Sequence, residues 1–537
     1  MNLHNKFWLI LAYVTISISL IAGFFWLIDH TYGMDWDEAL YINQAYKDFF
    51  SFKERGFYGL AKSIIVLDRS RPPAHRILVL PFTLIFGVNP VNLRLVSLIS
   101  LGISIIFIYL STKRIAGSVA GCLSAMFLAT CPVIISNSMR FGTEYPLYLS
   151  ISLTFYFLVL ILNSKQPRTD ELYRNWIGLA LAFALGGLAK TSFIFIVAPI
   201  LLLVFSFLDW LDVNVKPRLI CIFKALLGAI VILSPWWIYN FSSAFKYALY
   251  AGRFVRHSLG PKNSLGTWLN FLDLFNLSIF GTPLTILILA IVLHFLIQLN
   301  LKRIRLNSIH KITLLMCIVS IFPILILSAL GANQNPRLIS PILLPLAIIF
   351  GVVTIASRWT SRKWLVAITI GLFSFQLAVM VTPLLQKNSV SNNLIRPTLA
   401  TVMGRREQWD WSKLREICNQ HQIPNPSISY LGNAYTFNPP QISYPWVSVN
   451  ETVKVNWLWR YEQEIIDWKK IMKSVNSSDV ILTAPALIGD LGDKQDLDNQ
   501  HNIEFIQRMQ ENPRFAKPIE LEMGRFNSIR VLVFLRK

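Results

Sequence analysis

The sequence has little charge and few cysteines for its length. Of its 537 residues only 15% are charged, whereas soluble domains carry about 25%. Hydrophobic residues make up 54%, and the mean hydropathy is +0.50. Four of the 5 cysteines lie in apolar runs, and the chain has no CxxC, HExxH or phosphate-binding glycine loop. These absences argue against a soluble enzyme, a disulfide-stapled secreted domain, a zinc hydrolase and a P-loop NTPase.

A formal net charge of +21 suggests a nucleic-acid binder, but the distribution of the charge argues against one. The excess of Lys and Arg lies in residues 1–387, which hold the apolar runs. Residues 388–537 are nearly balanced, with 18 basic and 16 acidic residues. We therefore expect an integral membrane protein with no nucleic-acid partner.

Uncharged stretches of about 20 residues are long enough to cross roughly 30 Å of hydrocarbon as helices. About eleven such stretches predict transmembrane helices. They centre on residues 7–28, 92–112, 118–136, 144–163, 176–190, 192–208, 219–239, 272–298, 312–330, 338–356 and 364–384. The fifth and sixth are short and separated only by residues 189–191. If these two merged into one span, every later orientation would invert.

The loops between the predicted spans differ in charge. Cytoplasmic loops collect Lys and Arg. With the amino terminus inside, the inner loops hold most of these cations, among them Lys113, Arg114, Lys216, Lys302 and Lys363. We therefore predict a cell-membrane protein whose amino terminus is cytoplasmic and whose carboxyl-terminal part is extracytoplasmic. Two long loops, residues 29–75 and 240–271, then lie outside as well.

Two regions follow from this organisation. Residues 1–387 form an all-α polytopic membrane domain, and residues 388–537 form a small extracytoplasmic α/β domain. In the second region, residues 427–431, 480–483 and 529–535 are typical of strands, and residues 409–420 and 461–475 of helices.

An acidic cluster follows the first span, with Asp35, Asp37 and Glu38 within four residues. Carboxylates this close raise one another's pKa, which suits a proton acceptor. The same residues also suit the capped first turn of a helix. The spacing leaves both interpretations open. A Mg or Mn ion held by Asp35, Asp37 and a phosphate is a further option, although we expect no metal, because no outer His or Cys ligand stands nearby.

Further polar residues gather at the predicted outer ends of the spans. Each suits either a phosphate or substrate contact or simple anchoring at the membrane boundary. The candidates for substrate binding are Arg71, His75, Arg140, Glu144, Lys190, Arg256 and Arg337.

The ordered motifs resemble those of the multispanning glycosyltransferases of the C-type (GT-C) fold, in the branch related to protein O-mannosyltransferases and the lipid A aminoarabinose transferase. They are DWDEALY at 35–41, RPPAHR at 71–76, RFGTEYPL at 140–147, GLAK at 187–190, SPWWIYN at 234–240 and NPRLISPILLP at 335–345. Such enzymes transfer a sugar from a polyprenyl-phosphate carrier to a lipid, glycan or protein outside the membrane, usually with inversion. The resemblance implies that Asp37, beside Glu38, is the general base, with Asp35 as a rival. It also implies that Arg337, Lys190 and Arg71 neutralise the phosphate, and that Glu144 orients acceptor or sugar.

One departure bears on the substrate. Ser70-Arg71 stands where the aminoarabinose branch has Glu-Lys and where the mannosyltransferase branch has a His. The resemblance therefore favours neither substrate. The alternative from another class is a transporter or flippase for a lipid-linked or anionic substrate, which more often carries inverted repeats and polar groups deep in the membrane. A silent scaffold that uses its tail to bind envelope proteins is a third hypothesis.

Overall fold

The computed structural model of the protein describes residues 3–29, 35–163, 169–207, 215–254, 272–304, 306–330, 335–361, 363–385, 409–432, 437–459, 466–485, 495–523 and 529–537. The chain forms two compact units. The membrane unit comprises Met1–Asp29, Ile64–Leu78 and Arg94–Gly404. The sheet unit comprises His30–Ser63, Val79–Leu93 and Arg405–Lys537, so a segment from the first predicted outer loop joins the carboxyl-terminal residues.

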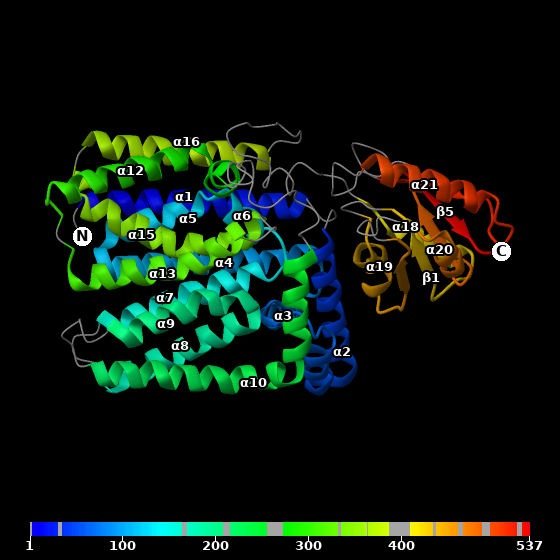
Figure 1. Cartoon of the computed structure of the whole chain (residues 1–537), viewed down its shortest axis with the longest axis horizontal. Coiled ribbons are helices and arrows are strands. Elements are labelled where there is room, and N and C mark those ends of the chain that lie inside the picture. Colours follow the sequence, from blue (N-terminus) through cyan, green and yellow to red (C-terminus); the bar gives the residue numbers. More distant parts are fainter. Residues whose placement is uncertain are drawn as a thin grey trace. The chain divides into compact units, whose positions relative to one another are not determined.

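Apolar helices, most of them long, make up the membrane unit, and Figure 1 shows the long ones running side by side. They are α1 (Leu3–Asp29), α4 (Pro90–Ala116), α5 (Ser118–Ala129), α6 (Pro132–Ser138), α7 (Glu144–Asn163), α8 (Thr169–Ala189), α9 (Ile194–Phe207), α10 (Val215–Phe254), α12 (Thr282–Asn300), α13 (Ser308–Leu330), α14 (Pro336–Ile339), α15 (Leu343–Ala356) and α16 (Lys363–Leu385). Short helical turns at Thr191–Phe193, Leu274–Phe280, Ser340–Ile342 and Trp359–Ser361 complete this part.

Eight of these helices are long and apolar enough to cross a membrane. A ninth crossing results if α5 and α6, which meet at a bend of 66°, are one broken span. The protein is therefore a multi-pass membrane protein, as predicted. The fifth and sixth predicted spans fall on α8 and α9, whose apolar parts are shorter, Arg174–Ala189 and Thr191–Ser206. By length and composition alone, eight or nine crossings are identified among the described helices, and the count of about eleven, which adds α8 and α9, stays a prediction.

Close helix contact in the membrane unit depends on small residues, as is common between membrane helices. Helix α5 packs on α15, where the Ser124 hydroxyl donates to the Ala347 carbonyl over 2.6 Å. A Cβ at Gly351 would lie 2.3 Å from Ser124 Oγ and 2.5 Å from the Ala120 carbonyl oxygen. Gly351 therefore sets the approach of these two helices.

Helices α2 (Trp36–Val66) and α3 (Ala74–Phe86) follow α1 along the chain. Helix α2 is broken at Gly56 (φ +60°, ψ −150°), so it consists of two helical segments that meet at a kink. A positive φ is favourable only for glycine, which explains the position of the break. The part before Gly56 is unusual because it buries polar side chains, among them Asn43, Gln44 and Asp48.

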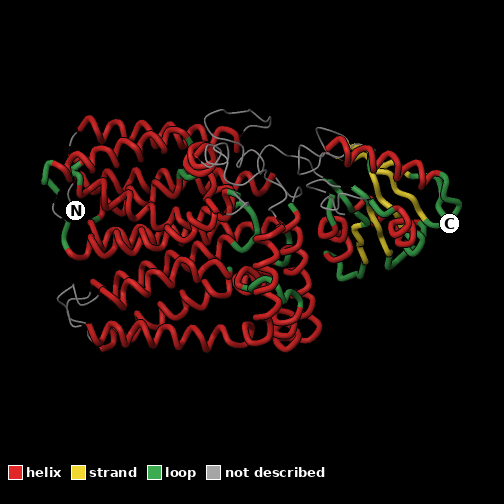
Figure 2. The backbone as a smooth tube through the Cα atoms, viewed as in Figure 1, coloured by secondary structure: helices red, strands yellow, loops and turns green. Residues whose placement is uncertain are grey.

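A five-stranded sheet of order β2-β1-β3-β5-β4 forms the centre of the carboxyl-terminal part (Figure 2). The strands are β1 (Ser427–Tyr430), β2 (Lys454–Trp457), β3 (Val480–Thr483), β4 (Ile519–Met523) and β5 (Ile529–Leu535). Strand β1 runs parallel to β2 and β3, with Ile428 opposite Val480, and β5 is antiparallel to β3 and β4. The sheet confirms the predicted small α/β region.

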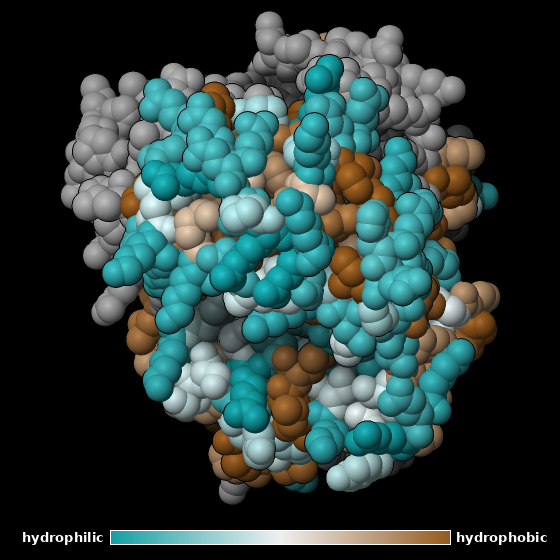
Figure 3. Space-filling view, turned by 90° about the vertical axis from the view of Figure 1, so that its right-hand side faces the viewer, coloured by the Kyte–Doolittle hydropathy of each residue, from teal (hydrophilic) through white to brown (hydrophobic). Residues whose placement is uncertain are grey.

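Helices α18 (Ser412–Gln420), α19 (Pro439–Val447), α20 (Trp468–Val475) and α21 (Gln495–Gln510) accompany the sheet. Buried aromatic residues such as Trp411, Tyr430 and Trp446 fill its core. The face of the molecule in Figure 3 is mostly hydrophilic with scattered hydrophobic residues, in keeping with the balanced charge of the carboxyl-terminal sequence.

Candidate active site

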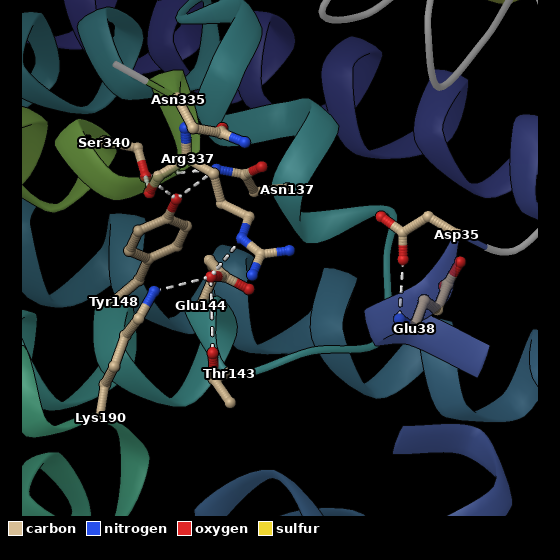
Figure 4. Close-up of polar contacts among 10 residues, drawn as sticks. All are labelled: Asp35, Glu38, Asn137, Thr143, Glu144, Tyr148, Lys190, Asn335, Arg337 and Ser340. Carbon is tan, nitrogen blue, oxygen red and sulfur yellow. Dashed lines mark hydrogen bonds and ion pairs between the residues drawn. The ribbon is translucent and has the colours of Figure 1, made fainter. Parts of the chain in front are cut away.

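Glu144, the first residue of α7, binds two cations that come from distant parts of the chain (Figure 4). Lys190 Nζ lies 3.0 Å and Arg337 Nε 2.9 Å from the same oxygen, Glu144 Oε1. The Glu144 side chain is 5% exposed, whereas those of Lys190 and Arg337 are 20% and 19% exposed. The buried carboxylate is thus neutralised within the fold, and the two cations keep part of their surface accessible.

Local structure explains where these side chains are held. An acidic residue is favourable at a helix amino terminus, which is the position of Glu144. Lys190 occupies the single extended residue between α8 and the turn at Thr191–Phe193. Arg337 lies in the first turn of α14, where the Asn335 side chain accepts a hydrogen bond from its backbone N–H over 2.9 Å.

A buried hydrogen-bond network lies next to this cluster, and the sequence analysis missed it. The Asn137 amide donates to Tyr148 Oη over 2.8 Å and to Ser340 Oγ over 3.2 Å. The Tyr148 and Ser340 hydroxyls share a short hydrogen bond, and Ser340 Oγ donates to the Arg337 carbonyl over 2.8 Å. Tyr148 follows Glu144 by four residues, so helical spacing could have indicated that the two share a face.

The electrostatic balance of this cluster favours an anion. Arg140 also interacts electrostatically with Glu144, so three cations face one carboxylate. A partly buried excess of positive charge attracts phosphate groups, and a guanidinium can bind two of their oxygens at once. The structure thus brings Arg140, Glu144, Lys190 and Arg337 together, in an arrangement suited to stabilising a phosphate leaving group.

The acidic cluster begins α2. Asp35 Oδ1 accepts a hydrogen bond from the Glu38 N–H over 2.7 Å, so Asp35 caps this helix. The capping interpretation of the sequence is therefore confirmed for Asp35. Glu38 is 3% exposed, and Asp37 is half-buried, which makes Asp37 more accessible than its two acidic neighbours.

Arg71 and His75 lie in and next to the proline-stiffened turn, and both are engaged within the fold. The Arg71 guanidinium donates to Tyr247 Oη over 2.7 Å and lies 3.7 Å from Asp68 Oδ2. The His75 ring is fully buried and packs edge-on against Phe141. Burial, reinforced by the neighbouring charge of Arg76, lowers the pKa of His75 to about 3. His75 also interacts electrostatically with Glu144. Arg256 lies outside the described residues.

Within the described ranges, no group of three or more His, Cys, Asp or Glu side chains is arranged to hold a metal ion. The expectation that no metal is required stays a prediction.

The fold of the chain is shared with solved structures of other proteins. It is similar to ArnT from Cupriavidus metallidurans bound to undecaprenyl phosphate, with a TM-score of 0.58, 12% identity and 97% of each chain covered. It is also similar to the oligosaccharyltransferase AglB from Archaeoglobus fulgidus in complex with an inhibitory peptide and a dolichol-phosphate, with a TM-score of 0.54, 11% identity, and coverage of 88% of this chain and 69% of that one. The chain thus has the C-type glycosyltransferase fold.

Part of the sequence also matches a known protein family. Residues 70–239 match the family described as dolichyl-phosphate-mannose-protein mannosyltransferase. This segment includes Arg71, Arg140, Glu144 and Lys190. No curated protein matches the chain. The match and the fold together confirm the predicted resemblance to C-type glycosyltransferases.

Proposed function

We propose that the protein is a membrane glycosyltransferase that moves a sugar from a polyprenyl-phosphate donor to an acceptor outside the membrane. The observation that carries the proposal is the cluster of Lys190 and Arg337 around buried Glu144, which sits in a fold shared with lipid-phosphate-dependent transferases. The cluster offers a leaving phosphate the positive charge that its departure requires.

In the proposed reaction the acceptor hydroxyl attacks the anomeric carbon of the sugar. The new bond joins the acceptor oxygen to that carbon, while the bond from the carbon to the phosphate oxygen breaks. The Asp37 carboxylate takes the hydroxyl proton, and polyprenyl phosphate leaves with the bonding electrons. Arg337 and Lys190 stabilise the charge that grows on the phosphate, and attack from the opposite side inverts the anomeric centre.

The proposed membrane topology is the orientation predicted from the sequence. We assign a cytoplasmic amino terminus, an extracytoplasmic carboxyl-terminal domain and eleven crossings, in which α8 and α9 each cross once. The loop cations Lys113, Arg114 and Lys363 support this orientation through the positive-inside rule. The acceptor is a lipid, glycan or protein, and the Ser70-Arg71 pair argues against assuming aminoarabinose or mannose as the sugar.

A transfer assay in lipid vesicles tests the proposal. Purified protein receives a panel of polyprenyl-phosphate sugars and envelope extract, and wild type is compared with Asp37→Asn and Asp35→Asn. Because Asn caps helices about as well as Asp, Asp35→Asn removes charge while keeping the cap. We expect Asp37→Asn to lower transfer by about 10²–10⁴-fold, the usual contribution of a general base.

The exposed Glu511→Gln serves as the matched control and should transfer at the wild-type rate. If Asp35→Asn alone abolishes transfer, Asp35 is the base. If wild type transfers nothing but moves lipid-linked sugar across the vesicle, the protein is a transporter and the proposal fails.

A further inference from the structure

The acidic motif is not held by its own helix alone. Trp36 stands between Asp35 and Asp37, and its ring packs on Trp457 with centroids 5.3 Å apart. Trp457 is the last residue of β2 in the carboxyl-terminal sheet. The side chain that lies between the two candidate bases is therefore held by a residue more than 400 positions away in the sequence.

Trp457 is itself fixed on its other side. Its indole N–H donates to the Gly432 carbonyl over 3.2 Å. Its ring stacks almost parallel on that of Tyr430, which is fully buried in the sheet core. An aromatic ring with a satisfied N–H and a buried stacking partner has few alternative rotamers, so it offers Trp36 a rigid contact.

Further contacts follow the same side of α2. The Asn43 amide nitrogen donates to the Pro440 carbonyl over 2.8 Å and to Ser443 Oγ over 3.1 Å, both in α19. The rings of Tyr46 and Tyr444 meet edge to face with centroids 5.8 Å apart.

Near the break of α2, Asn450 donates to Glu54 Oε1 over 2.9 Å. Residues 36, 43 and 54 lie on nearly the same side, because each helical residue turns the chain by about 100°. Residues of α19 accept both hydrogen bonds from the amide nitrogen of Asn43, which lowers the cost of burying this group.

We infer that the carboxyl-terminal domain positions the catalytic carboxylates, with Trp457, Pro440 and Tyr444 as positioning residues for the first turns of α2. The inference rests on the proposed function, because it assumes that the base lies in this motif. In this arrangement the domain is part of the catalytic apparatus, whether or not it also binds the acceptor. A base displaced by about 1 Å can cost roughly 100-fold in rate, so the contacts matter for kcat.

Two half-buried tryptophans of the same domain give a matched test. Trp457→Leu removes the contact with Trp36, whereas Trp468→Leu removes a ring that packs on Phe505 and touches no part of α2 among the described contacts. We expect Trp457→Leu to lower kcat by about 10- to 100-fold with the donor KM within about twofold of wild type. Trp457→Phe should restore most of the rate, because it retains an aromatic contact. Trp468→Leu should keep wild-type kinetics.

Hydrogen exchange on the full-length protein provides a readout that general damage to the domain would not produce. In Trp457→Leu the amides of residues 36–50 should exchange faster, while those of β1 and β3 keep their protection. Unchanged exchange in α2, or an equal loss of kcat in Trp468→Leu, would overturn the inference. If α2 exchanges faster in Trp457→Leu while Asp37→Asn, Asp35→Asn and Glu38→Gln all remain active, the base assignment fails and the positioning of α2 stands.

Discussion

Arg337 is held in a fixed position by the fold and still has part of its charged side chain accessible to a ligand. It pairs with buried Glu144 through Nε, its side chain remains 19% exposed, and its position is fixed by Asn335. A planar guanidinium stabilises a leaving phosphate through two parallel hydrogen bonds, which an ammonium cannot reproduce.

We therefore expect Arg337→Ala to lower kcat/KM for the lipid donor by about 10²–10³-fold, and Arg337→Lys to recover only part of the loss. Transfer kinetics with a single polyprenyl-phosphate sugar measure this. Arg303→Ala, an exposed arginine after α12, should behave as wild type. Equal activity of Arg337→Lys and wild type would mean that charge alone suffices.

His75 makes the stability of the protein depend on pH. Its pKa is about 3 in the folded protein and about 6.5 when unfolded, because burial disfavours the charged ring. Only the unfolded chain binds the proton between these values, so stability is constant above pH 6.5 and falls as the pH drops toward 3. Between pH 7 and pH 5 the loss amounts to about 2 kcal/mol.

Thermal unfolding in detergent at several pH values checks this. His75→Gln should flatten the decline below pH 6.5, even if its stability at pH 7 is lower. His421→Gln, which changes an exposed histidine, should leave the decline as it is. A full decline in His75→Gln would assign the pH dependence to another group.

At the scale of elements, the contact of α5 and α15 leaves little room for added side-chain volume. Gly351→Ala would place a Cβ against backbone at 2.5 Å, so the helices must separate. Overpacking of this kind costs about 1–3 kcal/mol. We expect a lower Tm for Gly351→Ala.

The matched change is Gly371→Ala in α16, where a Cβ meets nothing within 4 Å. It should leave the Tm unchanged or slightly raised, since Ala is the better helix former. A Tm for Gly351→Ala equal to that of the Gly371→Ala variant would show that α5 and α15 can separate without cost. Helix α15 follows α14, which holds Arg337, after one short turn. Transfer activity should therefore fall together with stability in Gly351→Ala.

The elements differ in how far the sequence could predict them. Helices of the membrane unit are evident, because apolar runs of about 20 residues have few other solutions. Strands β1, β3 and β5 are equally clear from apolar runs such as 480–483, whereas β2 and β4 contain charged residues, as in Ile519–Met523. Their strand identity depends on neighbours in the sheet, which no local pattern contains.

The candidate site was predicted as a set of residues but not as a cluster. The sequence indicated Glu144, Lys190 and Arg337 singly, through motif resemblance and position at span ends. It gave no distance between them, since Lys190 and Arg337 are separated by 147 positions and meet only through the fold. The supporting residues Asn137, Tyr148 and Ser340 look like ordinary polar residues of membrane helices until their hydrogen bonds are seen.

At the scale of the whole molecule, labelling of introduced cysteines tests the proposed orientation in the membrane. All five native cysteines are buried. Single cysteines introduced at exposed Lys113, Lys311 and Lys473 should therefore dominate labelling in intact cells.

With eleven crossings and an inner amino terminus, a membrane-impermeant maleimide should label Lys473→Cys and leave Lys113→Cys and Lys311→Cys unlabelled until the cells are opened. If α8 and α9 form one crossing, the pattern after them inverts. Lys311→Cys would then react from outside and Lys473→Cys would be protected, and the proposed placement of the carboxyl-terminal domain would be wrong.

The contacts between α2 and the carboxyl-terminal domain limit which recombinants of this protein can function. Asn43 with Pro440, and Trp36 with Trp457, form matched pairs whose members lie about 400 positions apart in the sequence. A recombination event that exchanges the carboxyl-terminal domain alone would separate both pairs at once. Functional chimeras with relatives of the same fold should therefore require that residues 36–55 and the carboxyl-terminal domain come from the same parent.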